Sequence, residues 1–261
     1  MSPISEEQFQ EAKARLRRIE AEYGVRILYA GEVGSRARGV ASSDADFDVR
    51  FLFVYPVAEY LKLAEPPHEI QVRDGLWDIR GLDLKEALRQ LKSGEPQTVS
   101  WLYTDPAYRN HPLFETEMKK RLEMLAPVSK LWWHLNHRAT DVKAQLAKGP
   151  QATYKLLLSA AEMALGLKFL NAQEELPPLD FATLVVSVRL DEADRETLQA
   201  LAKTKRESEE AAETDISQYP VVTRLLEEAL ALPPLNGNGI PNNVNEEDLN
   251  EFFLRWVGYE R

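Results

Sequence analysis

The feature of this sequence that most restricts its fold is a glycine-rich turn followed closely by two aspartates. The turn, GEVGSRARG, spans Gly31–Gly39, and Asp46 and Asp48 follow it at the start of an apolar run. That run predicts a strand, in which side chains two residues apart point to the same side of the sheet. Two carboxylates on one face repel each other unless a cation lies between them, and oxygen ligands suit a hard divalent ion. The pattern therefore predicts a site for Mg²⁺ or Mn²⁺ at Asp46 and Asp48.

The turn itself has the composition of a phosphate-binding loop. The apolar run Val25–Ala30 predicts a buried strand that leads into the turn, whose backbone N–H groups are suited to binding an anion. Ser35 has two roles open to it, donation to a phosphate and capping of the short helix that follows. Arg36 either contacts phosphate or forms an ion pair with Asp44.

A third aspartate falls on another predicted core strand. Asp74-Gly75 separates two strand-like runs, which is among the better short-range signals for a β-hairpin. Asp78 lies on the second arm, on the face opposite to Trp77. Two carboxylates that bridge two metal ions, with a third on one of them, recur in two-metal phosphoryl transfer. The sequence therefore contains three aspartates, Asp46, Asp48 and Asp78, that could form such a site.

Periodicity and caps predict helices and strands before about residue 95 and mainly helices after it. The expected elements of the first part are a helix between Ser5 and Gly24, strands at 25–30 and 46–55, a short helix at 35–40, a hairpin at 68–73 and 76–81, and a helix at 84–92 that begins after the cap Asp83. The expected helices of the second part lie near 96–104, 112–125, 129–148, 151–172, 180–188, 192–212, 219–231 and 246–258.

Composition limits the classes of function. The 261 residues carry a formal net charge of −10, which argues against a polybasic surface that binds nucleic acid along its length but permits a local basic groove. There is no cysteine, so thiolate metal ligands and cysteine nucleophiles are excluded. The N-terminal segment lacks a signal-peptide pattern and no run is apolar enough to span a bilayer, so we expect a cytoplasmic protein without a membrane partner.

Three stretches together resemble a known family. They read GSRARG at 34–39, SSDADFDVRF at 42–51 and WDIRGLDLKEAL at 77–88. They are similar to the bacterial nucleotidyltransferases of the DNA polymerase β superfamily that are associated with RNA repair. The resemblance implies an α+β chain, in which a polymerase β-like domain with a small mixed sheet and helices precedes an all-α domain.

The resemblance also implies roles for individual residues. Asp46 and Asp48 would be paired metal ligands and Asp78 the third, while Gly34 and Ser35 would form the turn that faces the phosphates. We expect a catalytic nucleotidyltransferase domain over 1–95, a helical substrate-binding domain over 96–235, and a linker with a detachable amphipathic tail over 236–261. Pro127 is the alternative position of the first boundary.

Three basic residues are further candidates for the site. Lys155 lies on a predicted helix of the second domain and is the lysine best suited to the triphosphate, although a helix lysine is usually solvated. Arg50 shares the face of the two strand aspartates, where it either pairs with them or contacts substrate phosphate. Arg80 shares a face with Asp78 in the same way.

The expected reaction is transfer of a nucleoside monophosphate from an NTP to a hydroxyl, with release of pyrophosphate and two metal ions. An RNA 3′ end, particularly of tRNA, is the favoured acceptor. Alternatives are a protein hydroxyl, a small molecule, and a non-catalytic nucleotide sensor on the same fold. A protein partner is conceivable but nothing in the sequence indicates one.

Overall fold

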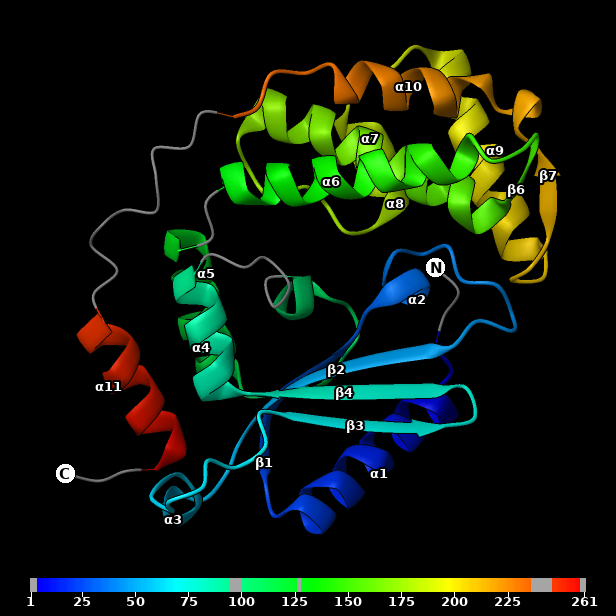
Figure 1. Cartoon of the computed structure of the whole chain (residues 1–261). Helices are drawn as coiled ribbons and strands as arrows, with labels where there is room; N and C mark the ends of the chain where they lie inside the picture. The colour runs from blue at the N-terminus through cyan, green and yellow to red at the C-terminus, as the bar shows by residue number, and fades with distance from the viewer. Residues whose placement is uncertain (1–3, 94–99, 126–127, 236–245, 259–261) are drawn as a thin grey trace. The chain divides into compact units, whose positions relative to one another are not determined.

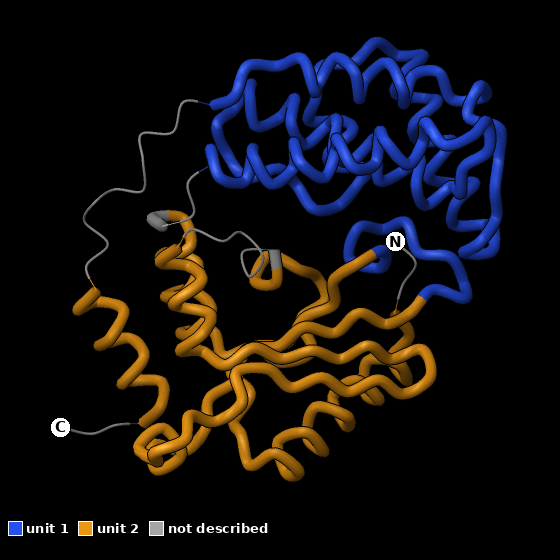
Figure 2. Tube along the Cα trace, viewed as in Figure 1, with its two compact units in different colours: residues 1–2, 35–45, 128–237 blue, residues 3–34, 46–127, 238–261 orange. Residues whose placement is uncertain are grey.

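A computed structural model describes residues 4–93, 100–125, 128–235 and 246–258, which fall into two compact units (Figures 1 and 2). The sheet unit contains the described residues of 3–34, 46–127 and 238–261, drawn in orange in Figure 2. The helical unit, drawn in blue, contains 35–45 and the described residues of 128–237. Segment 35–45 thus belongs to one unit while both of its chain neighbours belong to the other.

The sheet unit is built on a five-stranded mixed sheet. Its strands are β1 (Arg26–Glu32), β2 (Phe47–Val54), β3 (Glu69–Asp74), β4 (Trp77–Asp83) and β5 (Ala107–Asn110). Their order in the sheet is β3-β4-β2-β1-β5, with β2 and β4 parallel and all other neighbours antiparallel. The Asp74-Gly75 hairpin is confirmed as the connection between β3 and β4.

Helices accompany both faces of this sheet. They are α1 (Glu6–Tyr23), α3 (Val57–Tyr60), α4 (Leu84–Ser93), the 3₁₀ turn η1 (Ser100–Tyr103), α5 (Pro112–Leu125) and α11 (Glu246–Val257), and the short α2 (Gly34–Ala37) begins where the chain leaves β1. The predicted limits of α1 are confirmed, because Ser5 forms a full capping box with Gln8 and Gly24 ends the helix in the left-handed conformation.

Alternation along β2 and β4 separates an apolar face from a mixed face. Val49, Phe51 and Ile79 belong to one buried cluster with Leu16 and Ile19 of α1. The intervening residues of β2 and β4 therefore lie on the face opposite α1. Asp48 and Asp78 are among these, so the candidate site is on the face opposite α1.

Gly81 of β4 is expected to be sensitive to any side chain. A Cβ at this position would lie closer than 3.0 Å to the ring of Phe51, which is fully buried. We expect Gly81→Ala to lower the free energy of unfolding by about 1–3 kcal/mol, because the core cannot accommodate an added methyl without moving the ring. Urea denaturation measures the change. Gly149→Ala is the control, since nothing lies within 4 Å of its Cβ position, and equal effects of the two variants would contradict the prediction.

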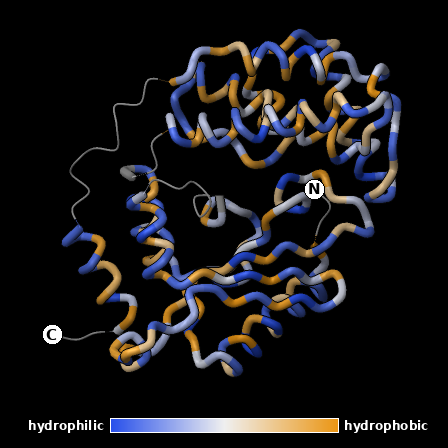
Figure 3. Tube along the Cα trace, viewed as in Figure 1, coloured by the Kyte–Doolittle hydropathy of each residue, from blue (hydrophilic) through white to orange (hydrophobic). Residues whose placement is uncertain are grey.

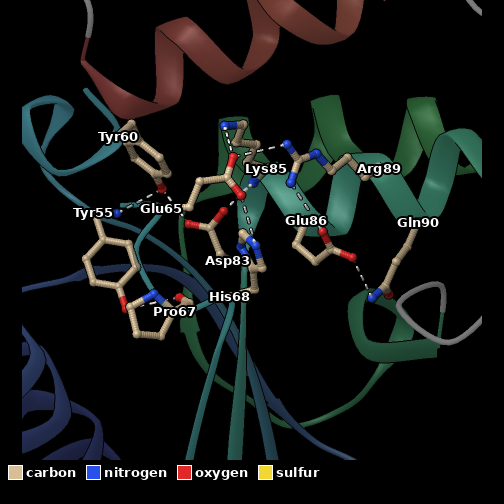
Figure 4. A network of polar contacts seen from close by, with 10 residues as sticks. All are labelled: Tyr55, Tyr60, Glu65, Pro67, His68, Asp83, Lys85, Glu86, Arg89 and Gln90. Carbon is tan, nitrogen blue, oxygen red and sulfur yellow. Dashed lines mark hydrogen bonds and ion pairs between the residues drawn. The ribbon is translucent and has the colours of Figure 1, made fainter. Parts of the chain in front are cut away.

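Asp83 ends β4 and begins α4 within a network of polar contacts (Figure 4). Its Oδ1 accepts the backbone N–H of Lys85 at 2.9 Å, which confirms the predicted cap, and its Oδ2 accepts the hydroxyl of Tyr60. Burial raises the pKa of the Asp83 carboxyl, although hydrogen bonds from Tyr60 and from the N–H groups of Lys85 and Glu86, with the charge of nearby His68, act in the opposite direction.

This raised pKa predicts a stability that depends on pH. A carboxyl that binds its proton more tightly in the folded state stabilises the fold fully below the unfolded pKa, and the contribution is lost as the pH rises through the folded pKa. Asp83→Asn keeps a capping side chain without the titration. We therefore expect the free energy of unfolding of the wild type, relative to this variant, to fall as the pH is raised from about 4 to about 7.

Urea denaturation at several pH values measures this dependence, and Asp215→Asn is the control. The hydrogen bond from the Ser217 backbone lowers the pKa of Asp215, so its contribution is lost as the pH falls, which is the opposite direction. A wild-type advantage over Asp83→Asn that stays level or grows with pH would contradict the prediction.

The helical unit surrounds one central helix. Its elements are α6 (Val128–Leu146), α7 (Tyr154–Gln173), α8 (Phe181–Ser187), α9 (Glu192–Glu207) and α10 (Pro220–Leu230), with a two-stranded ribbon of β6 (Gln151–Thr153) and β7 (Glu213–Asp215) and the 3₁₀ turn η2 (Ile216–Gln218). Helix α7 is buried on most of its circumference and contacts α6, α8, α9 and α10. Hydrophobic positions recur along all of these helices in Figure 3.

The predicted α+β class is confirmed, whereas the strand content after residue 82 is a correction. Strands β5, β6 and β7 have three or four residues each, and their sequences AYRN, QAT and ETD carry no alternating apolar pattern. Hydrogen bonds to partners distant in sequence create them. Of the helix expected at 96–104, residues 96–99 lie outside the described residues and 100–103 form η1.

The structure divides the chain differently from the predicted boundary at 95, and nearer to the alternative boundary at Pro127. Residues 100–125 belong to the sheet unit, because β5 pairs with β1 and α5 packs beside α4. The tail is not detached, since Leu249, Phe252 and Trp256 of α11 are buried in the sheet unit. The linker expected at 236–245 lies outside the described residues. Among the described residues, no helix combines the length and apolar composition needed to cross a bilayer.

Candidate functional site

Strands β2 and β4 bring two of the predicted aspartates together. Asp48 and Asp78 are direct partners in the parallel register of these strands. Their side chains point to the same face, with exposed fractions of 30% and 16%. The two carboxylates that the strand register brings together are therefore Asp48 and Asp78.

Arg50 connects these two carboxylates. Its Nη2 lies 3.0 Å from Asp78 Oδ2 and 3.6 Å from Asp48 Oδ1, and its Nη1 donates to the backbone carbonyl of Asp78 at 2.9 Å. Of the two roles predicted for Arg50, the ion pair is confirmed. The guanidinium offsets the repulsion that two neighbouring carboxylates would otherwise experience.

Asp46 directly precedes the first residue of β2 and is exposed. Across residues 4–93, 100–125, 128–235 and 246–258, no three His, Cys, Asp or Glu side chains are grouped to hold a metal ion. The place of Asp46 beside Asp48 and its role as a metal ligand remain predictions.

The Asp48–Asp78 pair nevertheless has features that suit a hard cation. Asp78 Oδ1 is buried, and no described residue forms a hydrogen bond with it. A buried carboxylate oxygen without a donor is costly, and a bound cation would remove that cost. The donor set consists of carboxylate oxygens, which Mg²⁺ and Mn²⁺ prefer. These two residues therefore fit a divalent ion.

Glu32, at the end of β1, is a residue that the sequence reasoning missed. It is fully buried; its Oε1 accepts the backbone N–H of Asp48 at 3.0 Å, and its Oε2 accepts the hydroxyl of Tyr108 at 2.6 Å. The N–H of Val33 donates to the carbonyl of Asp48 at 2.8 Å. Both backbone groups of Asp48 are thus held. The available signal was a single glutamate at the end of an apolar run, directly before the turn.

Gly34 packs against the candidate site. Its φ is +69°, a conformation that side chains disfavour, and a Cβ here would lie closer than 3.0 Å to Asp48 Oδ2. Only glycine permits this approach of the turn to the carboxylate. The sequence predicted the glycine at the turn, but its contact with Asp48 follows from the fold.

Ser35 and Arg36 belong to the helical unit, as does Lys155. The carbonyl of Ser35 accepts the N–H of Val40 at 2.9 Å, which closes a turn after α2. Arg36 Nη2 donates to the carbonyl of Ala45 at 2.6 Å, a contact that neither predicted alternative included. Lys155 Nζ lies 2.7 Å from a carboxylate oxygen of Glu210, and its side chain is 60% exposed. The roles predicted for these three residues remain predictions.

Arg80 extends the charged face of the sheet. It is the register partner of Arg50, so two guanidinium groups occupy neighbouring positions on adjacent strands. Among the described residues, nothing accepts a hydrogen bond from its buried Nε. Two adjacent arginines on the face of the aspartates would favour an anion there.

Comparison with known proteins finds a family model that matches most of this chain. The family model RlaP, described as the RNA repair pathway DNA polymerase beta family, matches residues 9–255. YcgL, an uncharacterized protein of Bacillus subtilis (strain 168), is 31% identical over 198 residues, which are 75% of this chain and 75% of YcgL.

One solved structure is also similar over much of its length. It is the crystal structure of a nucleotidyltransferase-like protein from Exiguobacterium sibiricum 255-15, 16% identical, with a match over 84% of this chain and 74% of that one. The TM-score is 0.30, which is too low to establish a common fold.

Proposed function

The chain belongs to the RNA repair pathway DNA polymerase beta family, and on that premise we propose that it transfers a nucleoside monophosphate from an NTP to an acceptor hydroxyl. Membership supports nucleotidyl transfer in general. The observation that carries the more specific proposal is the Asp48–Asp78 pair on adjacent strands, against which the glycine turn packs at Gly34.

In the proposed reaction the acceptor oxygen attacks the α-phosphorus of the NTP. The new oxygen–phosphorus bond forms as the bond between the α-phosphorus and the oxygen that bridges to the β-phosphate breaks, and pyrophosphate leaves. The proton of the acceptor hydroxyl passes to a carboxylate of the site. Each step needs negative charge to be stabilised at the phosphates.

Asp48 and Asp78 would hold a divalent metal ion, Mg²⁺ or Mn²⁺, and we propose Asp46 as a third ligand. When bound, such an ion lowers the pKa of an acceptor hydroxyl and neutralises charge on the leaving pyrophosphate.

The chain's own residues orient this centre. Glu32 and Val33 hold the backbone of Asp48, and Arg50 pairs with both carboxylates and holds them close together. A ligand set whose members are fixed before substrate binds loses less entropy in the reaction.

Phosphate contacts are proposed for the turn and for three cationic side chains. Gly34 and Ser35 would offer backbone N–H groups, and Arg36 a guanidinium. Arg80 is supported by its unpartnered Nε on the face of the aspartates. Lys155 is proposed to bind the triphosphate, for which it would exchange its ion pair with Glu210.

An RNA 3′ end is the acceptor that we propose, because the family's description refers to RNA repair. Transfer to a protein hydroxyl or to a small molecule, and nucleotide sensing without transfer, are the alternatives that the experiment must separate.

A label-transfer assay tests the proposal. Each α-³²P NTP is incubated with Mg²⁺, the protein and total cellular RNA, and the products are resolved on a denaturing gel with and without protease. We expect label in an RNA band that resists protease. Label in a protease-sensitive band would establish protein nucleotidylation instead. Nucleotide binding without label in either would leave a small-molecule acceptor or a sensor.

A further inference from the structure

Segment 35–45 is held by the helical unit although it connects two strands of the sheet unit. Its ends continue directly into Gly34 and Asp46, which belong to the sheet unit. Val40 is 3% exposed and is part of the buried core of the helical unit. This segment contains Ser35 and Arg36, the residues proposed above to contact phosphate.

The first part of the segment is fixed by α7, α8 and α9. Arg38 forms an ion pair with Glu162, a buried residue of α7. The carbonyl of Arg38 accepts a hydrogen bond from the N–H of Phe181 at 3.0 Å, and the carbonyl of Gly39 accepts one from Nη1 of Arg206 at 3.2 Å. Three helices distant in sequence therefore determine the path of the chain directly after the turn.

The second part is fixed by a polar cluster around the buried Lys205. Lys205 of α9 is 1% exposed, and its Nζ donates to Ser42 Oγ at 3.2 Å and pairs with Glu210. Glu210 also accepts the Ser42 hydroxyl at 3.1 Å, and its N–H donates to Asp44 Oδ2 at 3.1 Å. We call Lys205, Glu210, Ser42 and Asp44 the Lys205 cluster.

The cluster is well suited to specify one conformation. A buried ammonium group needs its partners, because loss of one leaves an uncompensated charge out of water. Burial raises the pKa of Glu210, but hydrogen bonds from Lys155 and Lys205 outweigh this and hold it below its usual range. A buried ion pair often adds little net stability compared with apolar residues of the same volume, so its value lies in the conformation that it selects.

We propose that the Lys205 cluster is a positioning device through which the helical unit sets the conformation of segment 35–45 and thereby the affinity for the NTP. The proposal rests on the nucleotide-binding function proposed above. Lys205 and Glu210 are positioning residues in this view, since they act on Ser35 and Arg36 through the segment.

Charge-matched variants separate positioning from stability. Glu210→Gln leaves Lys205 charged and buried, so we expect a lower melting temperature of the full chain. The double variant Lys205→Met with Glu210→Gln removes both charges, so its melting temperature should recover. Lys168→Met with Glu228→Gln is the control, because this ion pair, 2.6 Å long, joins α7 to α10 at the surface.

Two measurements follow on the same proteins, hydrogen exchange of the amides of residues 36–41 and the Kd of each NTP with Mg²⁺. The wild type and the double variant are compared with Lys155→Met in both, so that release of Lys155 from Glu210 cannot change the Kd. In the double variant we expect both the exchange rates and the Kd of the NTP to rise about tenfold, because the binding-competent conformation becomes a minor population. The control variant, Lys168→Met with Glu228→Gln, should match the wild type in both the exchange rates and the Kd.

The outcomes are distinct. A double variant with recovered melting temperature, wild-type exchange and wild-type Kd would mean that the cluster is only structural, and would overturn the proposal. Faster exchange with an unchanged Kd would overturn the link to nucleotide binding. A wild type that binds no NTP at all would refute the proposed function and, with it, the claim on affinity, while the exchange rates would still decide whether the cluster controls the segment.

Discussion

Replacing Asp48 by asparagine is expected to reduce nucleotidyl transfer by at least about a hundredfold while leaving the fold intact. The substitution removes one negative charge from the Asp48–Asp78 pair and weakens the site for a divalent ion. The fold should survive, because Glu32 and Val33 hold only backbone groups of residue 48, which asparagine retains. The rate of label transfer from α-³²P NTP in the presence of Mg²⁺ gives the size of the loss.

Asp74→Asn is the matched control for this variant. Asp74 ends β3 on the same sheet, its side chain is 66% exposed, and it pairs with Arg15 of α1. We expect transfer by this variant within about twofold of the wild type, since exposed ion pairs contribute little. An Asp48→Asn protein that turns over like the wild type would show that the assignment of the site is wrong.

Replacing Gly34 by alanine is expected to abolish most activity by a different route. The backbone at residue 34 has φ +69°, and the added Cβ would overlap Asp48 Oδ2. Either the turn or the carboxylate must move, so transfer should fall by about a hundredfold or more, as for loss of a preorganised group. The left-handed conformation should also lower the free energy of unfolding by about 1–2 kcal/mol.

Gly75→Ala isolates the effect of the overlap from that of the backbone. Gly75 has a similar φ of +58° at the β3–β4 hairpin, but nothing lies within 4 Å of its Cβ position. We expect both variants to lose comparable stability in urea denaturation, and Gly34→Ala alone to lose activity. Equal activity of the two variants would contradict a role for the close approach of the turn to Asp48.

The two predictions examine different properties of one arrangement. Asp48→Asn tests whether the charge of the carboxylate is needed, and Gly34→Ala tests whether its position against the turn is needed. If both reduce transfer while Asp74→Asn and Gly75→Ala do not, transfer needs both the charge of the Asp48 carboxylate and its position against the turn.

Local signals in the sequence determined most of the secondary structure. Ser5 and Gly24 limit α1, Asp74-Gly75 forms the hairpin, and Asp83 caps α4, as predicted. Each of these signals acts within a few residues, so the residues that specify a cap or a turn lie next to the helix or strand that they limit. The long helices α5 to α7 agree with prediction for the same reason, because periodicity over many residues is a strong signal.

The sequence also indicated which residue types carry the chemistry. Asp48, Asp78 and Gly34 were predicted as members of one site, and the structure brings these three together. Asp46 was predicted with them; it directly precedes β2, and its part in the site remains a prediction.

Only the tertiary structure decided how these residues are held. The register of β2 with β4 sets Asp48 beside Asp78, and Glu32 and Tyr108 support Asp48 from strands that meet it only in the folded sheet. Likewise, segment 35–45 belongs to the helical unit because Lys205 is buried against it, more than 160 residues away along the chain. Buried polar groups must find partners wherever the fold provides them, and no local pattern records those partners.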